Sequence, residues 1–503
     1  MVVHCHRSVK AQAGGWLLQP DSFDILIIGA GISGIGVACR LARRFPDKRI
    51  GILERRDAIG GTWDLHRYPG IRSDSDMFTY AYEFKPWQRP EILAHGEAIR
   101  DYIDETIDEF GIRERIRFGT RVESADWNSA DSAWSVLTQD TTTGEQRRLQ
   151  TRFLVACTGY YDHDRGYMPD YAGADDFEGD LVHPQHWPED LDYANRNVVV
   201  IGSGATAATV VPAMAGIARH VTMLQRSPSY YFPVTRLDPV FTITRPFLPD
   251  RLAARMARGR NQRLQYILFA MCRRWPNLMR RLLLRHVRKE LGPEVDMRHF
   301  TPRYAPWDER LCVLPADDLL HAVKSGAASV VTDTIETMTP RGIRLGSGRE
   351  LAADIIVSAT GFNLQVFGGI DVSVDGHPCP PSEKMIYKGV LVDGIPNFAV
   401  LFGYVNFAWT AKVDIAGRYL CRLFEHLDRT GIGVATPRSG NVHATGENIM
   451  NRLNSGYVNR GADDLPRQGT DAPWVVTHDY RKDRKTLLRD PVDDGVLEFR
   501  APT

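Results

Sequence analysis

Two glycine-rich turns, each placed between an apolar run and a helical pattern, constrain the fold of this chain more than any other feature. The first turn is Gly29-Ala30-Gly31-Ile32-Ser33-Gly34, directly after the apolar run 23–28. The GxGxxG spacing between a strand and a helix is typical of a Rossmann-like unit. Its glycines allow a tight turn, close approach of a diphosphate, and close packing of helix on strand. The first turn therefore predicts a dinucleotide site on a parallel sheet.

The residues after the first turn indicate which dinucleotide binds there. We predict a helix over 32–44 and a strand over 49–53, which ends at Glu54. An acid at the end of this strand accepts hydrogen bonds from ribose hydroxyls and repels a 2′-phosphate. Glu54 therefore favours FAD or NAD over NADP at the first turn.

The second turn is Gly202-Ser203-Gly204-Ala205-Thr206-Ala207, with Ala207 in place of the third glycine. It follows a predicted strand, 197–201, and precedes a predicted helix, 205–216. The next predicted strand, 220–224, ends at Gln225-Arg226-Ser227 rather than at an acid. Arg226 can pair with a 2′-phosphate and Ser227 can donate a hydrogen bond, which favours NADP. The alternative is that Arg226 is an ordinary solvated arginine on a loop.

An FAD site and an NADP site in one chain indicate hydride transfer from NADPH to a flavin. We therefore predict an α/β protein with two Rossmann-like domains and a helical insertion. Apolar strands running into glycine turns at 154–159 and 355–362 predict the chain crossings between the domains. The expected parts are a flexible tail (1–22), an FAD domain (23–160 and 370–503), an NADP domain (161–235 and 300–369), and a basic helical insertion (236–299).

Composition excludes several function classes. The chain has 62 basic and 62 acidic residues, so no overall positive field favours nucleic acid. Seven scattered cysteines without a CxxC pair argue against a zinc site or a disulfide reductase, and indicate a reduced, cytoplasmic protein. His4-Cys5-His6 could bind a metal, but a frayed tail is the simpler interpretation, and we expect no metal site.

Two segments stand out from the rest of the chain by their composition. Residues 250–290 hold eleven arginines and Lys289 against only Asp250 and Glu290, which predicts two or three basic helices. These helices either pack as a subdomain on the NADP domain or contact a membrane surface peripherally. The segment 430–475 is rich in Gly, Asn, Asp and Pro and predicts a long surface excursion.

Between the two turns, residues 177–188 read Phe-Glu-Gly-Asp-Leu-Val-His-Pro-Gln-His-Trp-Pro. This fits FxGxxxHxxxWP, and the chain resembles the Baeyer–Villiger monooxygenases from about residue 23 to its C-terminus. The segments 60–65, 67–76, 183–193 and 306–312 resemble the mycobacterial subgroup of ethionamide-activating and MymA-like enzymes. The resemblance implies an FAD- and NADPH-dependent enzyme that inserts one oxygen atom of O2 into a small apolar ketone, through a C4a-peroxyflavin. Sulfides or thioamides are further candidate substrates.

The resemblance also implies roles for individual residues. Arg310 would stabilise the anionic flavin peroxide, held in place by Asp74. Arg310 could instead form a structural salt bridge, and Asp76 could serve in place of Asp74. Gly61, Thr62 and Trp63 would lie against the flavin. Within the fingerprint, Phe177, Gly179, His183 and Trp187 would couple NADP binding to domain movement, or be purely structural.

Two departures from the family pattern affect specificity. Glu309 stands where many members have a lysine that contacts the NADP 2′-phosphate, so NADPH preference would rest mainly on Arg226. The segment 403–410 carries Val405 and Phe407-Ala408, which predicts a bulkier and more apolar flavin pocket. The alternatives to a monooxygenase are an uncoupled NADPH oxidase or flavin reductase, and a non-catalytic redox-sensing flavoprotein. The sequence leaves the oligomeric state open.

Overall fold

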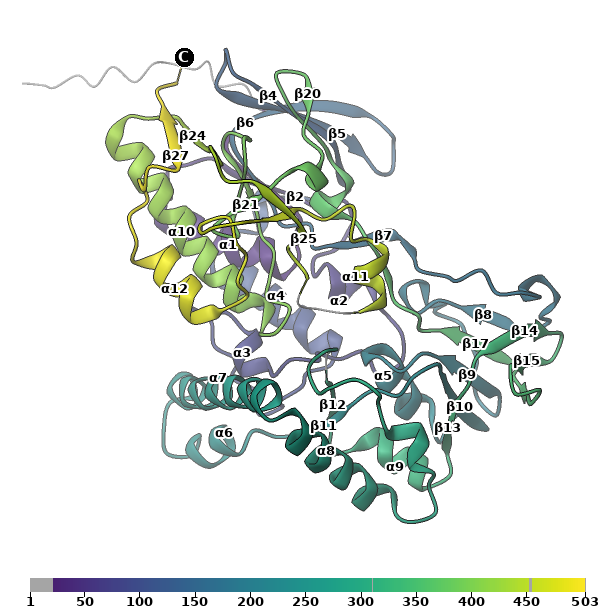
Figure 1. The fold of residues 1–503 in the computed structure, drawn as a ribbon. Coiled ribbons are helices and arrows are strands. Elements are labelled where there is room, and N and C mark those ends of the chain that lie inside the picture. The colour runs from purple at the N-terminus through teal and green to yellow at the C-terminus, as the bar shows by residue number, and fades with distance from the viewer. Residues whose placement is uncertain (1–20, 310, 452–454, 503) are drawn as a thin grey trace, which may run out of the picture.

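The computed structural model describes residues 21–309, 311–451 and 455–502. The predicted tail, except for residues 21 and 22, lies outside the described residues, as does Arg310. Two separate sheets, each covered by helices, form the two main parts of the molecule (Figure 1). The predicted mixed α/β fold with parallel-rich sheets is confirmed.

The first sheet has eleven strands and contains the first glycine turn. Its order is β20-β19-β4-β5-β6-β1-β2-β3, and β23 joins it through β6 and carries β22 and β21. Strand β1 pairs in parallel with β2 and β6, and its last four residues are buried, as its apolar run predicts. The bounds are β1 Ser22–Ile28, β2 Ile50–Leu53, β3 Ile116–Arg117, β4 Thr120–Asn128, β5 Ala133–Asp140, β6 Gln146–Ala156, β19 Asp371–Val374, β20 His377–Pro378, β21 Ile386–Tyr387, β22 Leu391–Val392 and β23 Phe398–Val400.

Helix α1 (Ile32–Arg44) covers this sheet and packs against α10 (Trp409–Thr430), which comes from the far end of the chain. An ion pair joins the two helices, with Arg40 Nη2 lying 2.6 Å from Asp414 Oδ1. Short and medium helices complete this layer: α2 Thr62–Leu65, α3 Met77–Tyr80, α4 Gly96–Glu109 and α12 Tyr480–Leu488. The helix predicted over 32–44 is thus confirmed.

The second sheet has five strands, all parallel, in the order β13-β10-β9-β17-β8. Helix α5 follows β9 through the second glycine turn, as predicted, although it ends two residues earlier than expected. The bounds are β8 Asp180–Val182, β9 Asn197–Ile201, α5 Ala205–Met214, β10 His220–Gln225, α9 Asp318–Lys324, β13 Ala328–Thr332 and β17 Ile355–Ser358. A small meander adjoins it, with β14 Ile335–Thr339, β15 Gly342–Leu345 and β16 Glu350–Ala352.

Two antiparallel strands connect the two sheets. Strand β7 (Tyr161–Gly166) leaves the first sheet after β6 and pairs with β18 (Phe362–Leu364), which returns after β17. These strands directly follow the predicted crossing segments. The chain therefore enters and leaves the second sheet along one narrow ribbon (Figure 1).

The basic segment forms two long helices, α7 (Asp250–Arg274) and α8 (Pro276–Leu291), beside the short α6 (Pro239–Thr244). The prediction of two or three basic helices is confirmed. The inner face of α8 carries Val287 and Leu291 into the core around β9 and β10. Within the described residues, no helix is long and apolar enough to cross a membrane.

The prediction of a surface excursion over 430–475 is wrong. Strand β24 (Val434–Pro437) pairs with β27 (Leu497–Arg500), and β25 (Ala444–Asn448) pairs with β26 (Arg467–Gly469). Trp474 is 1% exposed and Leu465 is fully buried. Few but large apolar residues anchor the segment, and its polar average composition conceals them.

Candidate functional site

The first glycine turn has no room for side chains at two of its three glycines. Gly29 has a φ of +100°, and a Cβ there would lie 2.7 Å from the carbonyl oxygen of Cys157. A Cβ on Gly34 would lie 1.8 Å from the carbonyl oxygen of Gly29. These two glycines therefore allow α1 and β6 to pack tightly against the turn.

Gly31 and Gly61 face each other across the start of α1. A Cβ on Gly31 would come 3.6 Å from the Cα of Gly61. Gly31 precedes α1, and no side chain caps this end of the helix. The backbone N–H groups of the first turn of α1 are thus available to an anion such as a diphosphate.

Glu54 lies at the end of β2 beside this turn and is 4% exposed. Its Oε2 accepts a hydrogen bond from the N–H of Ala30 at 2.7 Å, and its Oε1 accepts one from the N–H of Arg56 at 2.9 Å. Burial raises the pKa of the Glu54 carboxyl. Both oxygens keep a second lone pair, so the carboxylate can still accept hydrogen bonds from ribose hydroxyls.

In the second turn, a side chain would clash at Gly202 but would have space at Gly204. A Cβ on Gly202, whose φ is +137°, would lie 2.4 Å from the carbonyl oxygen of Ala359. Among the described residues, apart from Gly204 and its two chain neighbours, no atom lies within 4 Å of where a Cβ on Gly204 would be. Ala207 is fully buried, so its methyl group fits where the pattern allows a third glycine.

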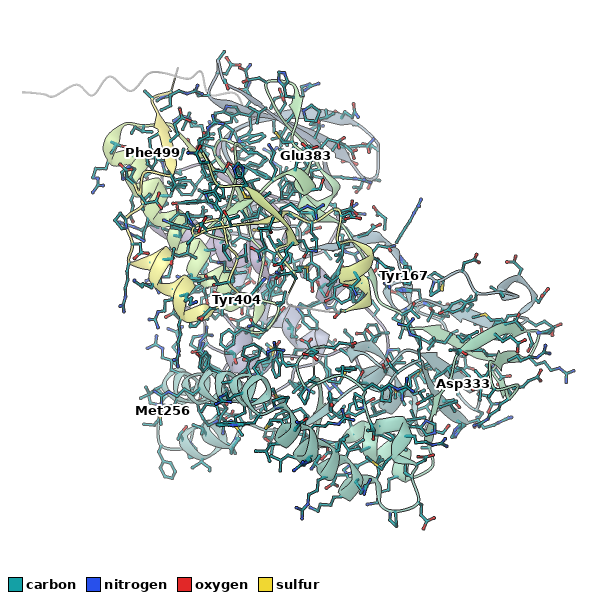
Figure 2. All side chains as sticks on the ribbon, viewed as in Figure 1. Tyr167, Met256, Asp333, Glu383, Tyr404 and Phe499 are labelled. Atoms are coloured by element: carbon teal, nitrogen blue, oxygen red, sulfur yellow. The ribbon has the colours of Figure 1, made fainter. Side chains whose placement is uncertain are left out.

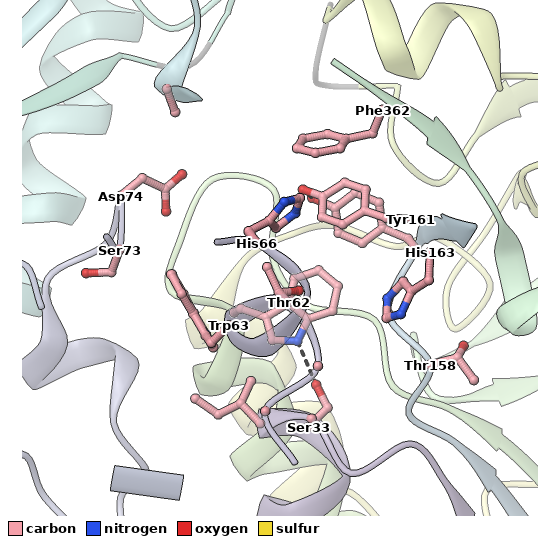
Figure 3. Close-up of a pocket in the computed structure, with 18 of the residues that line it drawn as sticks. Ser33, Thr62, Trp63, His66, Ser73, Asp74, Thr158, Tyr161, His163 and Phe362 are labelled. Atoms are coloured by element: carbon pink, nitrogen blue, oxygen red, sulfur yellow. Dashed lines mark hydrogen bonds between the residues drawn. The ribbon is translucent and has the colours of Figure 1, made fainter. Parts of the chain in front are cut away.

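Both turns open on the same cavity, whose volume is about 440 Å³. Figure 3 shows part of this cavity, with the side chains of Ser33, Thr62 and Trp63 on one side and those of Ser73 and Asp74 on another. The lining comes from the first sheet, from the second glycine turn with helix α5, and from the crossing ribbon. Of the residues predicted to bind cofactor, it includes Gly29, Gly31, Glu54, Gly61, Thr62, Trp63, Asp74, Gly204 and Thr206, but not Gly34, Gly202, Ala207, Arg226 or Ser227.

The two aspartates that compete for the catalytic role differ in position. Asp74 is exposed and lines the cavity. Asp76 accepts a hydrogen bond from the N–H of Thr79 at the start of α3, and another from Asn261 Nδ2 at 2.9 Å. Burial raises the pKa of Asp76 to about 6. The geometry therefore favours Asp74 as the residue that faces a ligand. Arg310 lies outside the described residues, but both of its neighbours line the cavity.

One of those neighbours, Glu309, is the acid that departs from the family pattern. Burial raises the pKa of its carboxyl, and the positive charge of Arg226 acts in the opposite direction. Arg226 and Ser227 are exposed at the end of β10. Glu309 therefore interacts electrostatically with Arg226, the arginine that the sequence analysis expects to bind the 2′-phosphate.

The fingerprint segment lies against the crossing ribbon. His183 Nε2 donates to the carbonyl oxygen of Gly361 at 3.2 Å, and its Nδ1 accepts from the N–H of Gln185 at 3.1 Å. A Cβ on Gly166, the last residue of β7, would lie 2.1 Å from His183 Cε1. His183 thus contacts the last residue of β7 and the residue that directly precedes β18. Burial lowers the pKa of its imidazole, consistent with the neutral ring that these hydrogen bonds require.

The other fingerprint residues pack within the second sheet. Phe177 and Trp187 are partly buried against its two apolar clusters. A Cβ on Gly179 would lie 2.3 Å from the carbonyl oxygen of Asp354.

The sequence analysis expected the segment 403–410 at the flavin pocket but missed the other aromatic residues of the cavity wall. Trp409 Nε1 donates to Ser33 Oγ at 2.7 Å, the bond dashed in Figure 3, and so fixes the segment 403–410 against the first turn. Phe407 lines the cavity, as its bulk suggested, whereas Val405 is buried away from it. The sequence did contain a signal: an aromatic residue directly follows the glycine of each crossing segment, Tyr160 after Gly159 and Phe362 after Gly361. The missed aromatic residues and histidines are His66, Tyr68, Tyr80, Tyr160, Tyr161, His163, Phe362 and Tyr457.

A buried carboxylate beside the first turn was also missed. Asp64 is 1% exposed, and its oxygens lie 2.6 Å from Arg56, 2.7 Å from Arg67 and 3.3 Å from Arg100. Three guanidinium groups keep this buried charge paired. The cluster holds the segment that follows Gly61 against α4.

Comparison with known proteins identifies relatives over nearly the whole chain. The family model described as flavin-binding monooxygenase-like matches residues 23–236. MymA of Mycobacterium tuberculosis is 56% identical over 483 residues, which are 95% of this chain and 98% of MymA. AlmA of Acinetobacter baylyi is 48% identical over 95% of this chain and 96% of AlmA. EthA of M. tuberculosis is 45% identical over 95% of this chain and 98% of EthA. Their names describe FAD-containing or FAD-binding monooxygenases.

Solved structures share the fold at low sequence identity. An oxidised steroid monooxygenase bound to NADP superposes with a TM-score of 0.75 at 22% identity, over 95% of this chain and 100% of that chain. A cyclohexanone monooxygenase bound to ε-caprolactone gives a TM-score of 0.70 at 21% identity, over 83% of this chain and 90% of that chain. The resemblance drawn from the sequence motifs is confirmed.

Proposed function

The chain belongs to the flavin-binding monooxygenase-like family and is a flavin-dependent monooxygenase, and from this premise we propose that it performs Baeyer–Villiger oxidation. In this proposal it consumes NADPH and O2 and converts a small apolar ketone to an ester. Sulfides and thioamides are proposed as further substrates for the same oxidant. The observation that carries the proposal is that both dinucleotide turns open on one cavity.

The residues of the first turn fit FAD. The uncapped start of α1 offers N–H groups to the diphosphate, and the space beside Gly31 lets that diphosphate approach the backbone. Glu54 would hold the ribose hydroxyls. Thr62 and Trp63 line the cavity where the flavin ring would lie. When bound, the flavin supplies the redox chemistry: it takes a hydride from NADPH and activates O2.

The residues of the second turn fit NADP, whereas the nearby Glu309 opposes binding of its 2′-phosphate. The open space at Gly204 and the uncapped start of α5 suit the diphosphate, and Thr206 lines the cavity next to them. Arg226 and Ser227 would contact the 2′-phosphate. Glu309 opposes that contact, so we propose a weaker preference for NADPH over NADH than a lysine at this position would give.

Asp74 and Arg310 would carry out the polar part of the oxygen transfer. An exposed carboxylate on the cavity wall can hold a guanidinium in a fixed orientation. The guanidinium of Arg310 would then stabilise negative charge on the oxygen being transferred and on the adduct with the ketone. Two observations support this proposal: Asp74 faces the cavity, and the residues on either side of Arg310 line it.

The cavity wall favours an apolar substrate. Phe362, Phe407, Trp409 and Leu311 contribute apolar surface near the predicted flavin position. Such a wall would also exclude water from the reaction.

Labelled oxygen tests this proposal directly. The purified enzyme with bound flavin is given NADPH, ¹⁸O2 and a ketone, and the ester is analysed by mass spectrometry. We expect one ¹⁸O atom per ester. Arg310→Ala should abolish ester formation while flavin reduction by NADPH continues, and Arg303→Ala, an exposed arginine on the same segment, should behave like the wild type. Ester formation by Arg310→Ala at the wild-type rate would contradict the assigned role.

We also propose the domain ranges that the sequence analysis predicts. We propose a cytoplasmic enzyme that contacts a membrane surface peripherally through residues 250–290. The excess of arginine in this segment supports such contact, because anionic lipids attract clustered basic residues.

A further inference from the structure

Exposed apolar side chains are concentrated on one part of the molecule. In the described part of the chain, fourteen large hydrophobic residues are exposed, and eleven of them lie between Leu237 and Leu282. The extreme cases are Phe247, which is 83% exposed, and Ile243, which is 67% exposed, both at or just after α6. Single exposed hydrophobic residues need no explanation, but a concentration of this kind indicates a binding surface.

On helix α7, several of the exposed residues lie on one side of the helix. Leu252, Met256, Arg263 and Ile267 follow one another at intervals of four, seven and four residues, so they share one side of the helix. All four are exposed, and Met256 is labelled at the outer edge of the molecule in Figure 2. The opposite side of α7 is buried at Ala253, Ala254, Ala257, Asn261 and Cys272, while Leu264 on that side is 52% exposed.

Helix α8 repeats this arrangement. Leu278 and Leu282 are exposed, and so are Arg281, Arg285 and Lys289 at intervals that place them on the same side. The buried side consists of Met279, Leu283, Val287 and Leu291. Helices α6, α7 and α8 lie next to one another along the lower edge of the molecule (Figure 1).

The charge of this surface indicates its partner. Apolar side chains alternate with arginines and a lysine, and residues 250–290 hold only two acids against twelve basic residues. Two copies of this surface placed face to face would bring like charges together, which disfavours self-association. A bilayer with anionic headgroups offers both an apolar layer and negative charge, which is the combination that an interfacial basic helix requires.

We infer that the exposed sides of α6, α7 and α8 form a docking surface for a bilayer that contains anionic lipids. The inference deepens the peripheral location proposed above and rests on it. The surface lies close to the predicted site, because the buried sides of α7 and α8 form an apolar cluster with Tyr230 and Leu311, and Leu311 lines the cavity.

Vesicle binding tests the docking surface without relying on turnover. The flavin-loaded protein is sedimented with vesicles of phosphatidylcholine, or of phosphatidylcholine and phosphatidylglycerol in equal parts. We expect roughly tenfold more binding to the anionic vesicles, weakened by salt. Equal binding to both, or no binding to either, would overturn the inference. The NADPH oxidation rate with a ketone, measured without vesicles, tests the proposed activity separately.

Matched variants assign the binding to this surface. The double variant Ile267→Glu, Leu282→Glu should lose most of the vesicle binding, roughly tenfold. Ile217→Glu with Phe118→Glu is the control, because Ile217 and Ile267 are both 51% exposed and Ile217 lies elsewhere in the fold. An equal loss in this control would overturn the assignment.

A charge variant keeps the test valid if the glutamates disturb folding. Arg281→Gln with Arg288→Gln should remove the preference for anionic vesicles while flavin content and melting temperature stay unchanged. A wild-type protein that forms dimers in solution, dissociated by the Ile267→Glu and Leu282→Glu changes, would show that a second copy covers this surface and would overturn the inference.

Discussion

The Nε2 atom of His183 lies 3.2 Å from the carbonyl oxygen of Gly361, the residue that precedes the returning strand β18. The same imidazole packs on Gly166, the last residue of the outgoing strand β7. One side chain of the fingerprint is therefore in contact with both connections between the sheets. A shift of one sheet relative to the other would change these contacts, which is the property expected of a coupling residue.

Replacing His183 should affect the NADPH step more than flavin binding. We expect His183→Ala to retain its flavin but to slow anaerobic flavin reduction by NADPH roughly tenfold, because the contact between fingerprint and ribbon is lost. Stopped-flow absorbance of the flavin measures this rate. His186→Ala, an exposed histidine in the same segment, is the control. Equal reduction rates in His183→Ala and the wild type would leave His183 with a purely structural role.

Filling the open glycine should block NADPH without unfolding the protein. The Cβ of Gly204→Leu would have open space around it, and the rest of the side chain would occupy the place of the diphosphate. We expect KM for NADPH to rise roughly tenfold or more, with little change in melting temperature. Gly259→Leu, which also enters open space but lies on α7, should leave KM unchanged. An unaltered KM in Gly204→Leu would remove this turn from the NADP site.

The cofactor preference should depend on Glu309. Glu309→Gln removes the charge that interacts with Arg226 and should raise the ratio of kcat/KM for NADPH to that for NADH several-fold. Glu309→Lys should raise it further, and Arg226→Ala should lower it. Steady-state kinetics with both cofactors measure the ratio. If Arg226→Ala left the ratio unchanged, the 2′-phosphate would be bound elsewhere.

Substrate range should follow Phe407 rather than Val405. Phe407→Ala enlarges the cavity, so we expect a lower KM for bulky ketones and a higher one for small ketones. Val405→Ala removes buried volume away from the cavity and should cost about 1–2 kcal/mol of stability with no change in the order of substrates. If Val405→Ala changed the order of substrates and Phe407→Ala did not, Phe407 would not be the residue that limits the cavity.

The protein should lose stability in mild acid because of two buried histidines. Burial lowers the pKa of both His66 and His163 from 6.5 to about 4. The unfolded chain therefore binds more protons than the folded one between about pH 6.5 and 4, and stability falls as pH falls through that window. His66 alone would account for roughly 3 kcal/mol over the whole window, of which about 2 kcal/mol is lost by pH 5. Melting temperatures at pH 7 and pH 5 should differ less in His66→Phe than in the wild type, and an equal difference would contradict the prediction.

Local patterns predicted the two turns, their strands and helices, and the acid at position 54 because short-range geometry determines them. Gly29 and Gly202 adopt positive φ in the structure, and Glu54 lies beside the first turn. The aromatic wall was not predictable in the same way. Trp409 reaches Ser33 across 376 residues of sequence, and no local pattern encodes that contact. The prediction of a surface excursion over 430–475 failed for the same reason, because Trp474 is buried by residues distant in sequence.

The most direct test of the central claim is the stoichiometry of the reaction. The flavin-loaded enzyme is reduced by NADPH under anaerobic conditions and then mixed with O2 and a panel of ketones and sulfides. Ester, sulfoxide and hydrogen peroxide are measured against the NADPH consumed. We predict oxygenated product close to one per NADPH for at least one substrate. Hydrogen peroxide equal to the NADPH consumed with every substrate, and no long-lived oxygenated flavin in the absorbance spectrum, would contradict the account and identify an oxidase.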